Sequence, residues 1–108
     1  MKLEEFKKKA ELVKDDERYR LDAYRKGKLV VSLTELKPHQ ETKGHSHPGI
    51  GEAYYFLEGK GKIQLGKEVT TVEGGDVIPI PDGEFHKVFN LLDKELKFFT
   101  FFEKYERG

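Results

Sequence analysis

Most of the chain consists of short runs in which apolar and polar residues alternate as they do in β-strands. Eight such runs, rich in β-branched and aromatic residues, follow one another: 19–25, 28–36, 52–58, 61–66, 68–73, 76–81, 86–92 and 95–105. Breaks that contain glycine or charged residues separate them, and this chemistry is typical of tight turns. The pattern predicts an all-β fold of antiparallel strands, arranged as a sandwich or barrel.

The N-terminal segment has a different period. Leu3, Phe6, Ala10 and Val13 recur at helical spacing among lysines and glutamates. Such spacing is typical of a short amphipathic helix with one apolar face. We therefore predict a helix over residues 3–14 that lies on a larger apolar surface.

The run at 95–105 is aromatic on both of its faces. In a strand, Phe98 and Phe102 share one face while Phe99 and Phe101 share the other. One pair can fill the interior, so the other needs a cover, either the N-terminal helix or a second subunit. Because a small sheet protein also leaves strand edges open, we expect a homodimer that uses residues 19–37 or the Phe99 and Phe101 face.

Length and composition narrow the classes of function. The chain has 108 residues, which suits one domain, and its 20 Lys and Arg balance 20 Asp and Glu, which disfavours a nucleic acid or an anionic membrane as partner. It contains no apolar run near the roughly 20 residues of a membrane span, no signal-peptide pattern and no cysteine, so we expect a cytoplasmic protein. The 37% charged content, with one Met and one Asn, is typical of a thermophile.

Histidines and one glutamate form the candidate chemistry. His45 and His47 are one residue apart, so an extended backbone projects both to the same side. The turn "PGIG" between them and Glu52 allows that carboxylate to swing back toward the imidazoles, and His86 starts another strand from which it can approach. Taken alone, the histidine pair is equally consistent with metal ligands and with ordinary hydrogen-bonded histidines.

Imidazoles and carboxylates suit a divalent first-row metal, and the lack of thiolate ligands argues against a closed structural zinc site. Four protein ligands on an octahedral ion leave about two positions for water or substrate. A metal site of this kind is open and therefore suited to chemistry.

Two stretches resemble the motifs of the cupin superfamily. Residues 44–59, "GHSHPGIGEAYYFLEG", carry the first pattern with His45, His47, Glu52 and Gly59 in place. Residues 75–90 carry the second pattern, as the stretch "GDVIPIPDGEFHKVFN", which contains Gly75, Pro81, Gly83, His86 and Asn90. One position departs: the family pattern has a glycine six residues before the first histidine, where this chain has His39. We interpret His39 as a loop residue and not as a further ligand.

The resemblance implies a small jelly roll or β-barrel that forms a single cupin domain over residues 1–108. Residues 1–18 are then an N-terminal helical extension and residues 19–105 the barrel. It also implies that His45, His47, Glu52 and His86 hold a divalent transition metal, which is Mn, Fe, Zn, Ni, Co or Cu.

Three functions follow from the resemblance and stay open. The segments "EAYYFLEGKGKIQL" and "IPIPDGEFHKVFN" look like the metal-bearing barrels of cupin-type phosphohexose isomerases. In that case the metal polarises a carbonyl or enediolate of a sugar or sugar phosphate, and Glu52 or another carboxylate moves a proton. The alternatives are a metal-dependent dioxygenase and a non-catalytic module that binds or senses a small ligand.

Strand alternation also predicts what surrounds the metal. If Glu52 points inward, Tyr54 does too, and the residues that alternate with His86 follow it: Val88, Asn90 and Leu92. Tyr54 is either a catalytic hydrogen-bond donor to a metal-bound substrate or a core tyrosine with a satisfied hydroxyl. Gln64 and Thr70 are further candidates for the lining.

Overall fold

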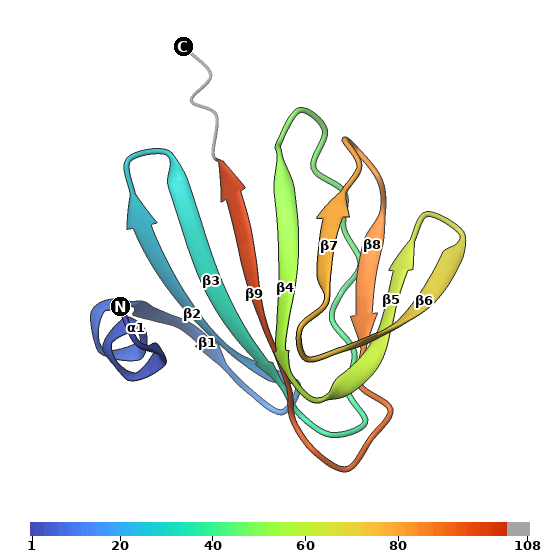
Figure 1. The fold of residues 1–108 in the computed structure, drawn as a ribbon, viewed down its shortest axis with the longest axis horizontal. Helices are drawn as coiled ribbons and strands as arrows, with labels where there is room; N and C mark the ends of the chain where they lie inside the picture. The colour runs from blue at the N-terminus through green and yellow to red at the C-terminus, as the bar shows by residue number, and fades with distance from the viewer. Residues whose placement is uncertain (104–108) are drawn as a thin grey trace.

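The computed structural model describes residues 1–103, and these form one short helix and nine strands (Figure 1). The elements are α1 (Leu3–Lys9), β1 (Glu11–Asp15), β2 (Tyr19–Lys26), β3 (Leu29–Leu36), β4 (Glu52–Glu58), β5 (Lys60–Leu65), β6 (Glu68–Glu73), β7 (Val77–Ile80), β8 (His86–Phe89) and β9 (Leu96–Glu103). All paired strands are antiparallel. The predicted all-β fold and its eight strand positions are confirmed, with residues 104 and 105 of the last run outside the described residues.

The strands form two sheets. The larger has the order β1-β2-β3-β9-β4-β7, and the smaller has the order β6-β5-β8. β9 therefore lies between β3 and β4, although it is the last strand in sequence (Figure 1). This crossover brings together strands that are far apart in the chain.

The core lies between the two sheets. It contains buried side chains from both of them: Leu36, Tyr54, Phe56, Ile63, Val72, Val88, Leu96 and Phe98. Phe98 packs against Tyr54 and Phe56, with ring centroids 5.4 and 5.3 Å apart. The prediction that one aromatic face of residues 95–105 fills the interior is thus confirmed for Phe98.

The helix covers part of the opposite face of the larger sheet (Figure 1). Phe6 is its buried residue, and its ring meets the edge of Phe99 at a centroid distance of 5.3 Å. Lys7 Nζ lies 2.7 Å from a carboxylate oxygen of the buried Glu35 on β3. Within residues 1–103, no helix is both long enough and apolar enough to cross a membrane.

The predicted helix over residues 3–14 is wrong in its second half. The helix ends at Lys9, and residues 11–15 are the edge strand β1, paired with β2. Leu12 and Val13 lie exposed on this strand. Backbone pairing with β2 outweighs the weak helical preference of so short a segment.

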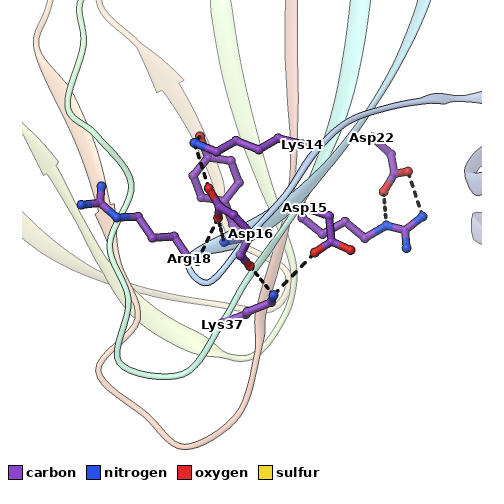
Figure 2. A network of polar contacts seen from close by, with 8 residues as sticks. Lys14, Asp15, Asp16, Arg18, Asp22 and Lys37 are labelled. Carbon is purple, nitrogen blue, oxygen red and sulfur yellow. Dashed lines mark hydrogen bonds and ion pairs between the residues drawn. The ribbon is translucent and has the colours of Figure 1, made fainter.

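A polar network closes the turn between β1 and β2 (Figure 2). Asp16 Oδ1 accepts hydrogen bonds from the backbone N–H groups of Arg18 and Tyr19, at 2.9 and 3.2 Å. Lys14 Nζ lies 3.2 Å from the other carboxylate oxygen of Asp16. The backbone hydrogen bonds hold the pKa of Asp16 down to about 2.

Asn90 ties together the ends of three strands. Its side-chain amide nitrogen donates to the carbonyl oxygens of Leu36, Lys37 and Lys94, at distances of 2.7–3.2 Å. Val88 and Asn90 are buried as predicted, whereas Leu92 is exposed. The prediction for Leu92 is wrong because β8 ends at Phe89 and the chain then turns, so that strand alternation no longer applies.

Candidate metal centre

An irregular segment beside β8 positions the first histidine. Thr42 N–H donates to the Val88 carbonyl at 2.9 Å, and His45 exchanges two backbone hydrogen bonds with His86, at 3.1 and 2.9 Å. This isolated bridge places the two imidazoles next to each other, with ring centroids 4.4 Å apart. Residues distant in sequence are thus brought into one site.

The turn after His47 directs the Glu52 carboxylate toward the two histidines. Gly49 N–H donates to Asp82 Oδ1 at 2.5 Å, which ties this turn to the turn that precedes β8. Glu52 then begins β4, and one ligand atom each from His45, His47 and Glu52 lie within 4.8 Å of one another. Residues 43–51 are not a regular strand, yet the two histidine rings still face the same site, with centroids 4.5 Å apart.

His86 has a buried ring nitrogen that lacks a partner. Its Nδ1 lies 3.0 Å from the Glu84 carbonyl oxygen, and because a carbonyl only accepts, Nδ1 carries the proton. Nε2 lies 3.3 Å from Glu52 Oε2, an ion-pair contact when the ring is protonated, and in the neutral ring this buried nitrogen has no hydrogen-bond partner within residues 1–103. A buried acceptor without a partner is costly.

These donors fit a divalent transition metal. A metal ion would bind the lone pair of His86 Nε2. It would also balance the negative charge of Glu52, whose side chain is 5% exposed. The Nδ1 hydrogen bond to a carbonyl is the arrangement that orients a metal-binding imidazole. The donor set of imidazole and carboxylate suits Mn, Fe, Co, Ni, Cu or Zn and does not choose among them. The role of His86 as fourth ligand stays a prediction.

The surroundings shift the pKa values of three side chains in the site. Burial, together with the neighbouring rings of His86 and His47, lowers the pKa of His45. Burial alone would lower the pKa of His86, but the Glu52 carboxylate and the Glu84 carbonyl outweigh it and raise the pKa. Burial raises the pKa of Tyr54 far above its usual value. Tyr54 therefore stays protonated and can act as a hydrogen-bond donor.

A cavity of about 230 Å³ opens onto the candidate metal centre. Its lining includes His45, His47, Glu52 and Tyr54, together with apolar side chains from β2 and β9. The predicted inward direction of Tyr54 is confirmed. A larger groove of about 810 Å³, between the loops around Gly59 and Lys94, contains none of the four proposed ligands. Most of its wall consists of charged residues at strand ends and in the loop before β9, and the His45, His47 and Glu52 cluster lies at the smaller cavity.

The other lining residues differ from those expected. Gln64 donates its side-chain N–H to the Gly66 carbonyl and Thr70 is exposed, so neither of them lines this cavity. Ser32, Thr34 and Thr100 do line it, and so does Lys43. These residues were not identified from the sequence. Strand alternation is the signal that could have indicated Thr100, which lies between Phe98 and Phe102 on the inward face, but the partner strands of β9 were not predictable.

His39 occupies the position at which the cupin pattern has glycine. Its backbone has φ of 61°, in the left-handed region that favours glycine. The ring lies on the surface, where Nε2 is 2.5 Å from Asp93 Oδ1. His39 is thus a loop residue outside the metal centre, as predicted.

Comparison with known proteins agrees with this geometry. A 53-residue segment is 42% identical to MJ1618, an uncharacterised protein of Methanocaldococcus jannaschii, and covers 49% of this chain and 42% of that protein. The fold superposes with a TM-score of 0.81 on an uncharacterised conserved protein with a double-stranded β-helix domain from Klebsiella pneumoniae, at 18% identity over 100% of this chain and 91% of the other.

A third similar structure carries a functional description. It is a predicted oxalate decarboxylase from Thermotoga maritima, with a TM-score of 0.75 and 22% identity over 81% of each chain. At such identities, the structural likenesses establish the fold alone. The family model described as Cupin domain matches residues 32–102, which include both histidine motifs and the parts of the cavity wall that β3, β4 and β9 contribute. The chain belongs to the cupin family.

Proposed function

We propose that this cupin is a metal-dependent enzyme that acts on a small molecule, with the metal held by His45, His47, Glu52 and His86. The observation that carries the proposal is the buried Nε2 of His86, which makes no hydrogen bond within the described part of the chain and lies 3.3 Å from the carboxylate of Glu52, a residue that lines the cavity. A bound metal would act there as a Lewis acid toward a substrate oxygen.

The cavity limits the size of the substrate. Its volume of about 230 Å³ lies below the roughly 300–1,000 Å³ of sites for drug-sized ligands, so a molecule of a few carbon atoms fits best. A sugar phosphate usually needs a clamp of several cations or hydroxyls around the phosphate. Lys43 is the one lysine or arginine among the described residues that line the cavity. The isomerase-like reaction is therefore better supported for a small sugar or hydroxycarbonyl compound than for a sugar phosphate.

Proton transfer in such an isomerisation falls to few groups. Glu52 is the one carboxylate among the described lining residues, so the base would be Glu52 itself. Tyr54, which stays protonated, would hold a substrate oxygen by donating a hydrogen bond. Both catalytic roles are proposals.

The scarcity of other acids and bases favours a second candidate. A non-catalytic cupin that binds or senses a small ligand needs the metal and the cavity but no separate base. An oxygen-activating enzyme would also use this ligand set and depend less on protein acid and base groups. For each of the three candidate functions, we propose that the partner is a small molecule and that the protein acts in the cytoplasm.

Elemental analysis of the purified protein is the first test. We expect about one transition metal ion per chain, removable by a chelator. Protein that contains no metal and binds none of Mn, Fe, Co, Ni, Cu or Zn on titration would overturn the proposal. The His39→Ala variant, altered on the surface, is the control for nonspecific binding by histidine.

Activity tests then separate the three candidates. Isomerisation of a small hydroxycarbonyl compound, abolished by chelator and restored by one metal, would support the isomerase. Oxygen consumption that depends on an added organic substrate would support the oxygenase. Metal-dependent binding without turnover would support the binding module.

A further inference from the structure

Three hydroxyl groups lie side by side on the inner wall of the cavity. Ser32 on β3 is directly opposite Thr100 on β9, and Thr100 is directly opposite Tyr54 on β4. Opposite residues of an antiparallel pair have Cβ atoms about 4.5–5.5 Å apart. The three residues, which we call the hydroxyl row, are each at most 7% exposed and all line the cavity.

Within the hydroxyl row, Thr100 and Tyr54 hydrogen-bond each other, and a hydroxyl so engaged can still take part in a further hydrogen bond. On β9 the neighbours of the row along the inner face are apolar, Phe98 and Phe102 on either side of Thr100, while on β3 and β4 the polar residues Thr34 and Glu52 continue it along the cavity. Valine has the shape of threonine without the hydroxyl, and burying a hydroxyl costs free energy unless it is hydrogen-bonded. A row of hydroxyls facing a cavity is instead suited to bind the oxygens of a ligand.

The charge of Lys43 indicates which charge the ligand would carry. Lys43 precedes the histidine motif by two residues, is exposed, and also lines the cavity. It has no ion-pair partner among the described residues, in contrast to Lys87, which pairs with Glu41 at 2.8 Å. A metal and a lysine beside one small cavity favour an anion.

We propose that the cavity binds a small carboxylic acid that carries a hydroxyl or keto oxygen on the carbon next to the carboxylate. This inference rests on the proposed metal site. The carboxylate lies toward Lys43 and the metal, and the adjacent oxygen is recognised by the hydroxyl row. The cavity volume of about 230 Å³ restricts the ligand to a few carbon atoms.

Three probes of nearly equal size test the two halves of the ligand. Lactate has both groups, propionate lacks the hydroxyl, and 1,2-propanediol lacks the carboxylate. Calorimetric titration of the metal-loaded protein should show that lactate binds about five-fold more tightly than propionate, which lacks a neutral hydrogen-bonding group, and at least about tenfold more tightly than 1,2-propanediol, which lacks the charged group. Equal affinity for all three probes would overturn the proposal.

Variants assign the effect to the named residues. Thr100→Val should reduce lactate affinity about five-fold without changing propionate affinity, and Thr100→Ser should restore it, since a neutral hydrogen bond contributes roughly two- to twelve-fold. Thr71→Val, on the exposed strand β6, is the matched control. Lys43→Gln should weaken lactate and propionate about equally, whereas Lys67→Gln, in the exposed turn before β6, should weaken neither.

Metal content, measured on each sample before titration, separates this inference from the proposed function. A protein without metal would refute the proposed function. A protein that holds its metal but does not prefer lactate, or a Thr100→Val variant that binds all probes as the parent does, would refute the hydroxy-acid or keto-acid ligand alone. Melting temperatures of the variants show whether they remain folded.

Discussion

The four histidines differ in burial, and this difference makes their roles separable. His86 is 1% exposed and its ring is part of the core, whereas His45 and His47 are exposed at the cavity. His39 lies outside the metal centre and contacts Asp93. Single substitutions at these positions should therefore affect metal binding and stability in different combinations.

If the proposed ligand assignment holds, replacing one of the assigned residues should reduce metal binding. We expect His47→Ala to lower bound metal at least tenfold while leaving the melting temperature of the metal-free protein within a few degrees, because the side chain is exposed. His86→Ala should lower both metal content and stability, since it leaves a cavity in the core. Elemental analysis and thermal unfolding measure the two effects. Stoichiometric metal in both variants would contradict the ligand assignment, and His39→Ala should retain its metal.

His39 gives a prediction about backbone strain. A side chain in the left-handed region costs roughly 1–2 kcal/mol, while glycine costs about 0.5–1 kcal/mol of chain entropy on folding. The exposed contact with Asp93 is worth little. His39→Gly should therefore stabilise the protein by roughly 0.5–1 kcal/mol in urea unfolding, whereas His39→Ala, which keeps the strained φ, should not. A loss of stability in the glycine variant would show that the Asp93 contact outweighs the strain.

At the scale of elements, the turn between β1 and β2 depends on an ionised carboxylate. The pKa of Asp16 is about 2 in the folded protein and 3.8 in the absence of its contacts. Because the folded pKa is the lower one, the carboxylate stabilises the fold above about pH 4, and this contribution is lost as the pH falls toward 2. The edge strand β1 should therefore be weakened by acid.

The Asp16→Asn variant tests this linkage. Asparagine can still accept the backbone hydrogen bonds of Arg18 and Tyr19, but it does not titrate. We expect the parent to be more stable than the variant at pH 5, and the difference in free energy of unfolding to shrink between pH 4 and pH 2. Glu17→Gln, an exposed change in the same turn, should show no such convergence. A difference that is constant across this range would contradict the prediction.

The strands were predictable from sequence, while the N-terminal segment was not. Alternation and turn chemistry indicate β2 to β9 because those signals are local. Residues 11–15 carry a helical period, but their structure is decided by β2, a strand with which they pair only in the folded chain. The same limit applies to Leu92, whose direction depends on where Asn90 anchors the chain.

The candidate site was predictable in part. The spacing of His45, His47 and Glu52 marks the cluster that the structure brings together. The hydroxyl row was not recognised because it depends on the pairing of β3, β9 and β4, which the chain does not encode locally. Candidate ligands that share a motif can therefore be predicted from the sequence. The cavity wall, which three strands form together, can be recognised only when the strand order is known.

The whole molecule leaves an apolar surface on the outer face of the larger sheet. α1 covers Phe99, but Phe101 remains 39% exposed, and Val77 on the same face of β7 is 59% exposed. Exposed apolar side chains grouped on a sheet are typical of interaction surfaces. The predicted homodimer through the Phe99 and Phe101 face would cover them.

Sedimentation tests the dimer. The parent protein should sediment as a dimer, and Phe101→Glu should weaken association at least tenfold, because it would bury a charge in the interface. Leu91→Glu, which changes an exposed leucine in the loop after β8, should leave association unchanged. A parent that sediments as a monomer would contradict the prediction.

The central place of β9 has a consequence for the order of events during synthesis. A nascent chain that ends before Leu96 has β3 and β4 as separate edges, because the strand that joins them has not yet emerged. Pairing of strands so distant in sequence is also slow. All four proposed metal ligands precede β9 in the sequence. They therefore emerge from the ribosome before Thr100, which completes the cavity wall. A newly made chain therefore has its proposed ligands before it has its cavity, because the cavity wall is complete only once β9 is in place.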